Sequence, residues 1–224
     1  VAYDLGMRGP GWVAFMRPLR GNELVGIHGF RVRRDVENVL RGEVAGRRAV
    51  VIGGGVLGGE AAAALALRGM QVSLLHRGPH LMDAQLDAHT AELLRLSLVT
   101  RGITSVLQAQ TAAYLADHSG CVKAVALRDE REIPARRVVV AAGVRPEIAL
   151  ARSAGLACDR GILVNDRLYT SDPDISAIGE CCQQGQPPVG LVAPCLQHAD
   201  ALAARLLAYP LAPTDPPCRG AGQR

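Results

Sequence analysis

Aromatic residues are scarce in this chain of 224 residues, of which phenylalanine, tryptophan and tyrosine together make up 3%. Proteins that bind single-stranded nucleic acids stack bases on aromatic side chains, and few are available here for that purpose. A strong excess of positive charge is also missing, because 25 basic residues are balanced by 21 acidic ones, with the signs mixed along most of the chain. We therefore expect no nucleic acid among the partners of this protein.

Long apolar runs and closely paired cysteines are missing as well. The longest purely apolar run covers residues 61–67, whereas a helix that crosses a bilayer needs about 20 apolar residues. None of the six cysteines is part of a C-x-x-C pair, which argues against a zinc ribbon and against a thioredoxin-type redox couple. No secretory signal is visible either. We expect a cytoplasmic protein with reduced cysteines, no metal site and no membrane span.

The chain does contain an alternation of helix-type and strand-type segments, and 49% of its residues are hydrophobic. Residues 48–52, 72–75 and 137–140 are short and apolar, are rich in β-branched side chains or leucine, and end at or near glycine, as expected for buried parallel strands. Residues 56–68 and 87–101 are rich in alanine or leucine and are each followed by a glycine, as expected for helices. This order predicts an α/β fold with a parallel sheet.

Weaker patterns indicate further elements. Strand-like segments separated by turn residues predict an antiparallel β-meander, at residues 105–108, 112–116 and 122–127. Other segments are expected to be helical, near residues 34–41, 146–154 and 195–208, or extended, at residues 162–164 and 175–178. Residues 1–20 show no sustained period, and the proline-rich segment from Pro210 onward is expected to be coil.

A glycine-rich turn joins the first buried strand to the first long helix, in the stretch VIGGGVLGGE at residues 51–60. Gly53, Gly55 and Gly58 satisfy the pattern G-x-G-x-x-G, which is weak alone but is flanked here by the strand and the helix that a dinucleotide site requires. The first glycine permits the tight turn, the second lets the backbone approach a pyrophosphate, and the third lets helix and strand pack closely. We therefore predict a dinucleotide-binding turn rather than a merely structural one.

The end of the second strand bears on which cofactor is bound. Proteins that bind NADH often carry an acidic residue there, which accepts a hydrogen bond from the ribose. This chain has His76 and Arg77 instead. An arginine can pair with the 2′-phosphate of NADPH, and a histidine can still bind a ribose. Surface residues without a cofactor contact are a third interpretation, so the sequence leaves both NADH and NADPH open.

Two other predicted strands end at glycine, at the edge where open α/β sheets bind their ligands. Gly143 follows the strand at 137–140, and Gly179 with Glu180 follows the strand at 175–178. The Glu180 carboxylate could accept a hydrogen bond from a sugar or ribityl hydroxyl, or it could be a surface acid in a turn. Its spacing does not decide between the two interpretations.

Together these motifs resemble the pyridine nucleotide/FAD oxidoreductase family, which includes glutathione reductase. The resemblance rests on VIGGGVLGGE, VVVAAGVRP (residues 138–146), GILVNDRLYTSDPDISAIGE (161–180) and GLVAPCLQHADALAARL (190–206). It implies FAD and NAD(P)H as cofactors, with a Rossmann-like NAD(P)H domain inserted in a partial FAD-binding domain. By this resemblance, residues 1–44 are the tail of the first FAD half-domain and a linker, residues 45–145 the NAD(P)H-binding domain, and residues 146–224 the second FAD part with a C-terminal tail.

Within this family, residues 81–103 and 144–181 look most similar to the flavin module of assimilatory nitrite reductase large subunits and of related nitrate reductase electron-transfer subunits. This likeness implies that electrons pass from NAD(P)H through FAD to a metal-centre partner, either an iron–sulfur and siroheme domain or a small redox protein, in nitrite or nitrate assimilation. Rubredoxin and ferredoxin reductases are the nearest alternatives, and a homodimer is compatible with the family. Such chemistry requires no side-chain acid, base or nucleophile, so we predict no catalytic residue.

The resemblance also implies roles for particular residues. The glycine turn would bind the pyrophosphate of NAD(P)H, and Glu60 would orient its nicotinamide end. Gly143 would lie near both cofactors, while Gly179 and Glu180 would match the second flavin motif, whose acid binds the ribityl chain. The helix expected from about Cys195 would face the flavin ring with its N-terminus.

The chain also departs from the family pattern. Residues 1–45 contain no G-x-G-x-x-G that could hold the ADP part of FAD, and the C-x-x-x-x-C redox pair of the reductases proper is absent, as are ligands for siroheme or an iron–sulfur cluster. Cys181 and Cys182 follow Gly-Glu, where small residues are common, so a packing role is favoured over a vicinal redox pair. These departures keep a second hypothesis open, in which the chain is a truncated nucleotide-binding module without turnover.

Overall fold

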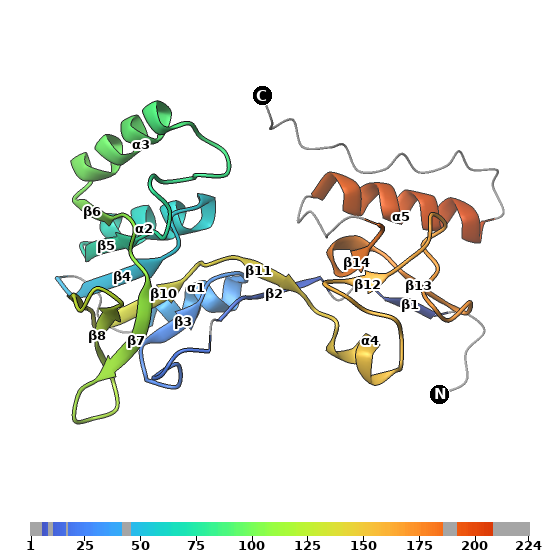
Figure 1. The fold of residues 1–224 in the computed structure, drawn as a ribbon, viewed down its shortest axis with the longest axis horizontal. Helices are drawn as coiled ribbons and strands as arrows, with labels where there is room; N and C mark the ends of the chain where they lie inside the picture. Colours follow the sequence, from blue (N-terminus) through green and yellow to red (C-terminus); the bar gives the residue numbers. More distant parts are fainter. Residues whose placement is uncertain (1–5, 9–10, 17, 42–45, 186–191, 208–224) are drawn as a thin grey trace. The chain divides into compact units, whose positions relative to one another are not determined.

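The computed structural model describes residues 6–8, 11–16, 18–41, 46–185 and 192–207. The chain divides into two compact units, which we call the central unit (Ala14–Gly143) and the terminal unit (Val1–Val13 with Val144–Arg224). Figure 1 labels the helices and strands of each unit. The predicted α/β class is confirmed, because helices alternate with strands along the described chain and a parallel sheet is present.

The central unit is built on a five-stranded parallel sheet in the order β3-β10-β4-β5-β6. Its strands are β3 (Ile27–Gly29), β4 (Arg48–Ile52), β5 (Gln71–Leu75), β6 (Ile103–Val106) and β10 (Arg137–Val140). β4 lies in the middle, with β10 on one side and β5 on the other. The buried strands that the sequence predicted are therefore confirmed, and they form the centre of this sheet.

The helices α1 (Arg33–Leu40), α2 (Val56–Leu67) and α3 (Ala88–Thr100) contribute to one hydrophobic core on this sheet. α2 consists almost entirely of alanine, leucine, valine and glycine, and its small residues allow close approach to the strands. α3 begins after Asp87, whose side chain accepts a hydrogen bond from the main-chain N–H of Thr90 at 2.8 Å. All of these helices were predicted, and their ends lie within one residue of the expected bounds.

The antiparallel strands β7 (Thr111–Ala116), β8 (Val122–Leu127) and β9 (Glu132–Pro134) form the predicted meander, but its composition differs from the expectation. Residues 105–108, expected as its first strand, lie instead at the end of β6 and in the loop after it. The reason is that β6 pairs in parallel with β5. β9 is the third strand of the meander, and its three residues are too few to produce a period-2 pattern.

Successive side chains of β4 point to opposite faces of the sheet, and each face has its own core. Ala49 and Val51 belong to the core that contains the helices. Val50 belongs to a second core, which contains Tyr114 of β7 and Val125 of β8. Because β4 is buried on both sides, it forms a continuous hydrophobic run rather than an alternating one.

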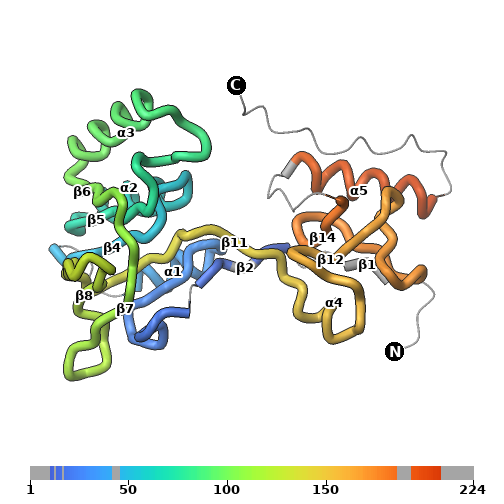
Figure 2. Tube along the Cα trace, in the orientation of Figure 1, coloured from blue at the N-terminus to red at the C-terminus, as the bar shows by residue number. Residues whose placement is uncertain are grey.

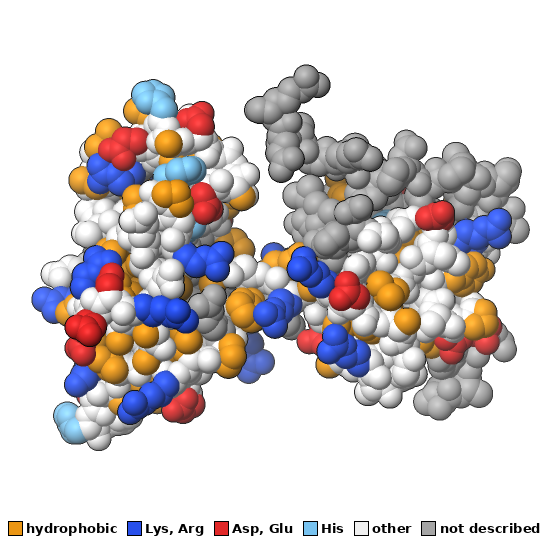
Figure 3. Space-filling view, in the orientation of Figure 1, with side chains coloured by type: hydrophobic (Ala, Val, Ile, Leu, Met, Phe, Trp, Pro, Cys, Tyr) orange, Lys and Arg blue, Asp and Glu red, His pale blue; other side chains and the backbone are white. Residues whose placement is uncertain are grey.

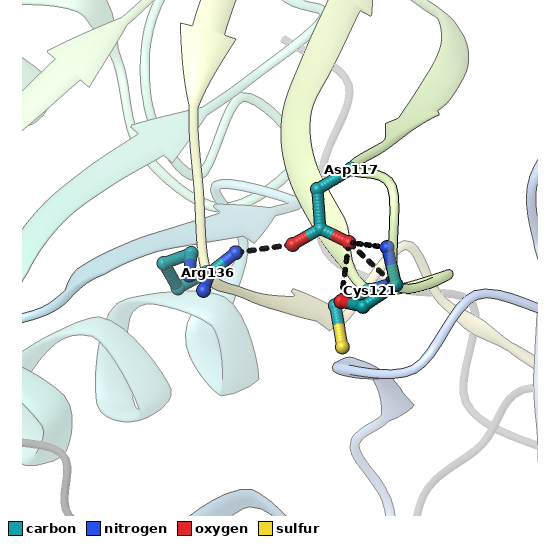
Figure 4. A network of polar contacts seen from close by, with 4 residues as sticks. Asp117, Cys121 and Arg136 are labelled. Atoms are coloured by element: carbon teal, nitrogen blue, oxygen red, sulfur yellow. Dashed lines mark hydrogen bonds and ion pairs between the residues drawn. The ribbon is translucent and has the colours of Figure 1, made fainter.

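A carboxylate closes the hairpin between β7 and β8, as Figure 4 shows. Asp117 Oδ1 accepts hydrogen bonds from the main-chain N–H groups of Ser119 (2.9 Å) and Cys121 (3.0 Å) and from the Ser119 hydroxyl (2.7 Å). Its Oδ2 accepts a hydrogen bond from the Arg136 guanidinium at 2.6 Å. The Ser119 hydroxyl and then the Arg136 guanidinium hold the pKa of this carboxyl well below its usual range.

The central unit begins earlier in the chain than the sequence suggested. The expected boundary between residues 44 and 45 differs from the division seen between Val13 and Ala14. β3 lies within the reassigned stretch and pairs with β10 in the parallel sheet, so residues 14–41 belong with the sheet. A three-residue strand is too short to be recognised from sequence. At the other end, the units divide between Gly143 and Val144 rather than between residues 145 and 146.

The terminal unit contains pairs of short strands. β1 (Gly6–Arg8) pairs in parallel with β13 (Ile175–Ala177), and β12 (Ile162–Leu163) pairs in parallel with β14 (Cys182–Gln183). β2 (Trp12–Ala14) pairs with β11 (Val144–Pro146). The predicted strands near residues 162 and 175 are confirmed, whereas the strands of two or three residues at β1, β2, β11 and β14 were not expected.

The helices of this unit are α4 (Ala149–Ser153) and α5 (Val192–Leu206), both labelled in Figure 2, and α5 is hydrogen-bonded to the strand β13. One arginine links α5 to that strand. The Arg205 guanidinium lies 3.9 Å from the ring centroid of Tyr169 and donates a hydrogen bond to the buried Ser176 hydroxyl at 2.7 Å. The coil expected from Pro210 onward lies outside the described residues.

Figure 3 shows basic, acidic and apolar side chains interspersed on the drawn face of the central unit. In the part of the chain that the structure describes, no helix combines the length and the apolar character that crossing a membrane requires.

Candidate functional site

The predicted dinucleotide turn lies where β4 ends at one edge of the sheet. Gly53 has a φ of +117°, a conformation that side-chain-bearing residues rarely adopt. Its N–H donates a hydrogen bond to the Leu75 carbonyl at the end of β5 at 2.9 Å. A Cβ added at Gly53 would overlap the carbonyl oxygen of Ala141, which follows β10. Three strand ends therefore converge on this position, and only glycine fits there.

The start of α2 approaches this turn closely but leaves open space beside it. A Cβ at Gly58 would overlap the carbonyl oxygen of Gly53, whereas a Cβ at Gly55 would meet no atom within 4 Å. Gly55 is the N-cap residue of α2, and within the described residues no side chain caps this end. The first N–H groups of the helix thus have no side-chain cap, and together with the positive end of the helix dipole they fit a pyrophosphate.

Three further predicted residues, Gly143, Glu60 and Arg77, are exposed. Gly143 follows β10 and is exposed, and its carbonyl accepts a hydrogen bond from the Phe15 N–H at 3.0 Å. Because β10 and β4 are parallel neighbours, Gly143 lies at the same edge of the sheet as Gly53. Glu60 on α2 and Arg77 after β5 are both exposed, so both side chains are accessible to a ligand.

His76 is placed differently from the interpretations that the sequence offered. Its side chain is only 12% exposed, so it is not a surface residue. The ring nitrogen Nδ1 accepts a hydrogen bond from the main-chain N–H of Gly54 at 3.2 Å. The histidine therefore supports the glycine turn from within the protein, and a direct contact with a ribose stays a prediction.

The remaining predicted residues belong to the terminal unit. Gly179 and Glu180 lie in a single 3-10 turn, η1 (Gly179–Cys181), which follows β13. Gly179 has a φ of +78° and open space around the position of a Cβ. The main-chain carbonyl of Glu180 accepts a hydrogen bond from the indole N–H of Trp12 at 2.5 Å. This contact fixes the backbone of the turn, while the Glu180 side chain is partly exposed.

The adjacent cysteines behave as packed side chains. Cys181 and Cys182 are buried, and their thiols donate to the main-chain carbonyls of Ile178 at 3.3 Å and Gly179 at 3.1 Å. Cys182 Sγ also lies 3.2 Å from His198 Nδ1. Burial raises the pKa of Cys181 to about 11 and that of Cys182 to about 12, so both thiols stay protonated at neutral pH. A protonated thiol is a poor nucleophile, which favours packing over redox chemistry.

Sequence reasoning missed Gly54 in the turn and Asp83 in the loop after β5. A Cβ at Gly54 would come within 2.8 Å of the His76 ring, and Asp83 Oδ2 lies 3.4 Å from His76 Nε2. Three consecutive glycines were the available signal, because the motif itself requires only two of them. Among the described residues, no group of three histidine, cysteine or acidic side chains is arranged to hold a metal ion.

A buried parallel strand, a tight glycine turn and an uncapped helix at the carboxyl edge of the sheet define a dinucleotide-binding α/β domain. The sequence profile of the pyridine nucleotide-disulphide oxidoreductases matches residues 10–199. This chain belongs to that family, whose members use FAD and NAD(P)H.

Two proteins of Bacillus subtilis are among the relatives with a similar sequence. The chain is 37% identical over 212 residues to the assimilatory nitrate reductase electron transfer subunit of Bacillus subtilis, covering 94% of this chain and 27% of that protein. It is 39% identical over 201 residues to the nitrite reductase [NAD(P)H] of the same organism, covering 90% of this chain and 25% of that protein. The chain therefore spans about a quarter of the length of these relatives.

Solved structures show the same fold. A ferredoxin reductase from Rhodopseudomonas palustris superposes with a TM-score of 0.87 at 28% identity, covering 96% of this chain and 54% of that one. The covalent putidaredoxin reductase–putidaredoxin complex gives a TM-score of 0.85 at 27% identity, covering 96% of this chain and 53% of that one.

Proposed function

We propose that this chain is the nucleotide- and flavin-handling part of an NAD(P)H-dependent FAD oxidoreductase that passes electrons to a metal-centre partner. The observation that carries the proposal is the turn at residues 53–58, where Gly53 and Gly58 are sterically required and Gly55 faces open space. When bound, NAD(P)H would supply a hydride, and FAD would accept its two electrons and release them one at a time. The protein's own residues bind and orient these groups.

The central unit is the proposed NAD(P)H domain. Its turn holds the pyrophosphate through main-chain N–H groups at the start of α2, where the helix dipole favours negative charge. Glu60 orients the nicotinamide end, and exposed Arg77 is positioned after β5 to pair with a 2′-phosphate. The main chain at Gly143, which follows β10, is proposed to lie close to both the nicotinamide and the flavin.

The terminal unit is the proposed contribution to an FAD site. Gly179 offers a left-handed backbone with open space beside it, and Trp12 holds the peptide of Glu180. These features fit a turn that binds the ribityl chain of a flavin. A turn for the ADP part of FAD does not occur in residues 1–45, and titration with FAD measures how tightly this chain holds the cofactor.

The relatives support a role in nitrite or nitrate assimilation. For that role we propose an iron–sulfur and siroheme domain as the acceptor. A reductase for a small redox protein is the second candidate. It is supported by 40% identity over 172 residues to the nitric oxide reductase FlRd-NAD(+) reductase of Aeromonas hydrophila, of which the match covers 44%. Reduction rates with added rubredoxin, ferredoxin and a siroheme protein would separate the candidates.

Titration of the purified chain with NADH, NADPH and FAD separately, followed by ferricyanide reduction in the presence of FAD, tests the core of the proposal. We expect saturable NAD(P)H binding and FAD-dependent turnover. Gly55→Val is the matched variant, because its Cβ enters the open space at the turn and meets no atom within 4 Å. It should abolish NAD(P)H binding and leave the thermal midpoint unchanged.

Two outcomes would change the conclusion. NAD(P)H binding without any affinity for FAD would favour the alternative of a nucleotide-binding module without turnover. Equal binding of both nucleotides by the wild type and by Gly55→Val would contradict the assignment of the turn itself.

A further inference from the structure

Gly54, the middle residue of the three glycines, is held from several directions at once. Its N–H donates to His76 Nδ1 at 3.2 Å, and its carbonyl accepts a hydrogen bond from the Met82 N–H at 2.8 Å. A Cβ at this position would lie 2.7 Å from Leu81 Cδ2 and 2.8 Å from the His76 ring. The residue is therefore enclosed by β5 and by the loop that follows it.

The histidine that makes this contact is itself rigidly placed. Its main-chain N–H donates to the Val106 carbonyl at 2.9 Å, and its carbonyl accepts from the Ala109 N–H at 2.8 Å. These bonds tie His76 to the end of β6 and to the segment after it. The main chain of His76 is thus tied to β6 and the segment after it, while its imidazole is bonded to the glycine turn.

The hydrogen bond also defines the tautomer of the ring. Nδ1 accepts a hydrogen bond from the Gly54 N–H, so in the neutral imidazole the ring proton is on Nε2. Nε2 is buried and lies 3.4 Å from Asp83 Oδ2, a contact too poorly aligned for a hydrogen bond. The nearby carboxylate nevertheless favours the Nε2–H tautomer electrostatically. Arg77, His80 and Asp87 are the other titratable groups between β5 and α3, and Arg77 is exposed.

We infer that His76 is a positioning residue of the dinucleotide turn, which holds the main chain at Gly54 in the shape that receives the pyrophosphate. This inference rests on the proposed function. It differs from a direct contact between His76 and the ribose, because the accepting nitrogen is already occupied by the protein backbone. Discrimination between NADH and NADPH at the ribose is then assigned to Arg77, the exposed residue that follows His76.

Two substitutions separate the hydrogen bond made by the His76 side chain from the space that this side chain fills. His76→Asn retains an acceptor, because the Asn Oδ1 occupies the same place in its side chain as Nδ1 does in histidine. His76→Phe keeps the ring shape and removes the acceptor. The dissociation constant for NADH, the inhibition constant of inorganic pyrophosphate against NADH, and the exchange rate of the Gly54 amide proton are measured for each variant, together with the thermal midpoint.

We expect His76→Phe to weaken NADH and pyrophosphate alike by about tenfold, the size expected when a buried donor loses its acceptor. Its Gly54 amide should exchange faster, and His76→Asn should restore all three quantities to within about threefold of wild type. Weaker NADH binding with unchanged pyrophosphate inhibition would show that His76 reads the ribose and would overturn the inference. So would a His76→Phe protein that binds like the wild type. If the wild type itself binds no NAD(P)H, the proposed function fails first and the inference falls with it.

Discussion

Gly58 lies directly against the carbonyl oxygen of Gly53, so that a Cβ on Gly58 would overlap that oxygen. The next residue along the same helix, Gly59, has no atom within 4 Å of the position of its Cβ. Two adjacent glycines of α2 therefore have opposite surroundings. One permits the close approach of helix and strand that shapes the turn, and the other has no steric role.

Gly58→Ala should therefore destabilise the protein by about 1–3 kcal/mol, because the helix must move away from the strand end to admit a methyl group. It should also weaken NAD(P)H binding, because the glycine turn at residues 53–58 would open. Gly59→Ala is the matched control, and we expect it to raise stability by roughly 0.5–1 kcal/mol through helix propensity. Urea denaturation and nucleotide titration measure both effects. Equal effects of the two substitutions would contradict the role assigned to Gly58.

Arg77→Ala should change the choice between the nicotinamide cofactors. A guanidinium that pairs with a phosphate contributes about 1.5–3 kcal/mol, so the NADPH-to-NADH ratio of kcat/KM should fall by roughly tenfold or more. Arg101→Ala, at the exposed end of α3, controls for the loss of one positive charge. An unchanged ratio in Arg77→Ala would show that this arginine does not contact the 2′-phosphate.

Arg137→Met should loosen the end of α1. The guanidinium of Arg137 donates to the carbonyl of Asn38 at 3.1 Å, to that of Arg41 at 2.8 Å, and also to that of Val39. The last turn of α1 has no basic residue of its own, so these carbonyls depend on β10. We expect a loss of about 1.5–3 kcal/mol in unfolding free energy and faster amide exchange within α1. Arg128→Met, an exposed residue after β8, should be nearly neutral.

Asp117→Asn should lower the thermal midpoint by several degrees at neutral pH, because the amide replaces a carboxylate that accepts bonds from Ser119, Cys121 and Arg136. The folded-state pKa of Asp117 is depressed. Its stabilisation is therefore fully present above the unfolded value of about 3.9 and is lost as the pH falls through the folded value. The difference between wild type and variant should shrink on acidification.

Thermal unfolding between neutral pH and strongly acidic pH provides the measurement. Glu130→Gln, in the exposed turn before β9, removes one negative charge from the same meander and should have a small effect. A difference between wild type and Asp117→Asn that is independent of pH would contradict an electrostatic role for Asp117.

Local pattern in the sequence predicted the central elements of the candidate site. β4 is a continuous apolar run because both faces of the sheet are covered, and α2 is rich in strong helix formers with glycines at its start. A strand, a glycine turn and a helix that are contiguous in the chain leave a signal that can be read directly. The family resemblance rests on the same contiguous stretches.

Contacts between distant residues left no such signal. β3 and β9 are three-residue strands whose extended conformation comes from pairing with β10 and β8. One strand of the meander was therefore misplaced, and the predicted boundary between residues 44 and 45 differs from the division into compact units. Neighbouring elements, rather than local period, determine the conformation of segments this short.

His76 shows the same division within the site. The sequence determined that a histidine and an arginine follow β5, where side chains can contact the ribose or the 2′-phosphate of a cofactor. Only the tertiary structure decided that the histidine turns inward, because its orientation depends on a hydrogen bond to Gly54, 22 residues away, and on β6. Helix and strand period report which face of an element is apolar. The direction of a polar side chain at a strand end depends instead on which buried backbone group would otherwise lack a partner.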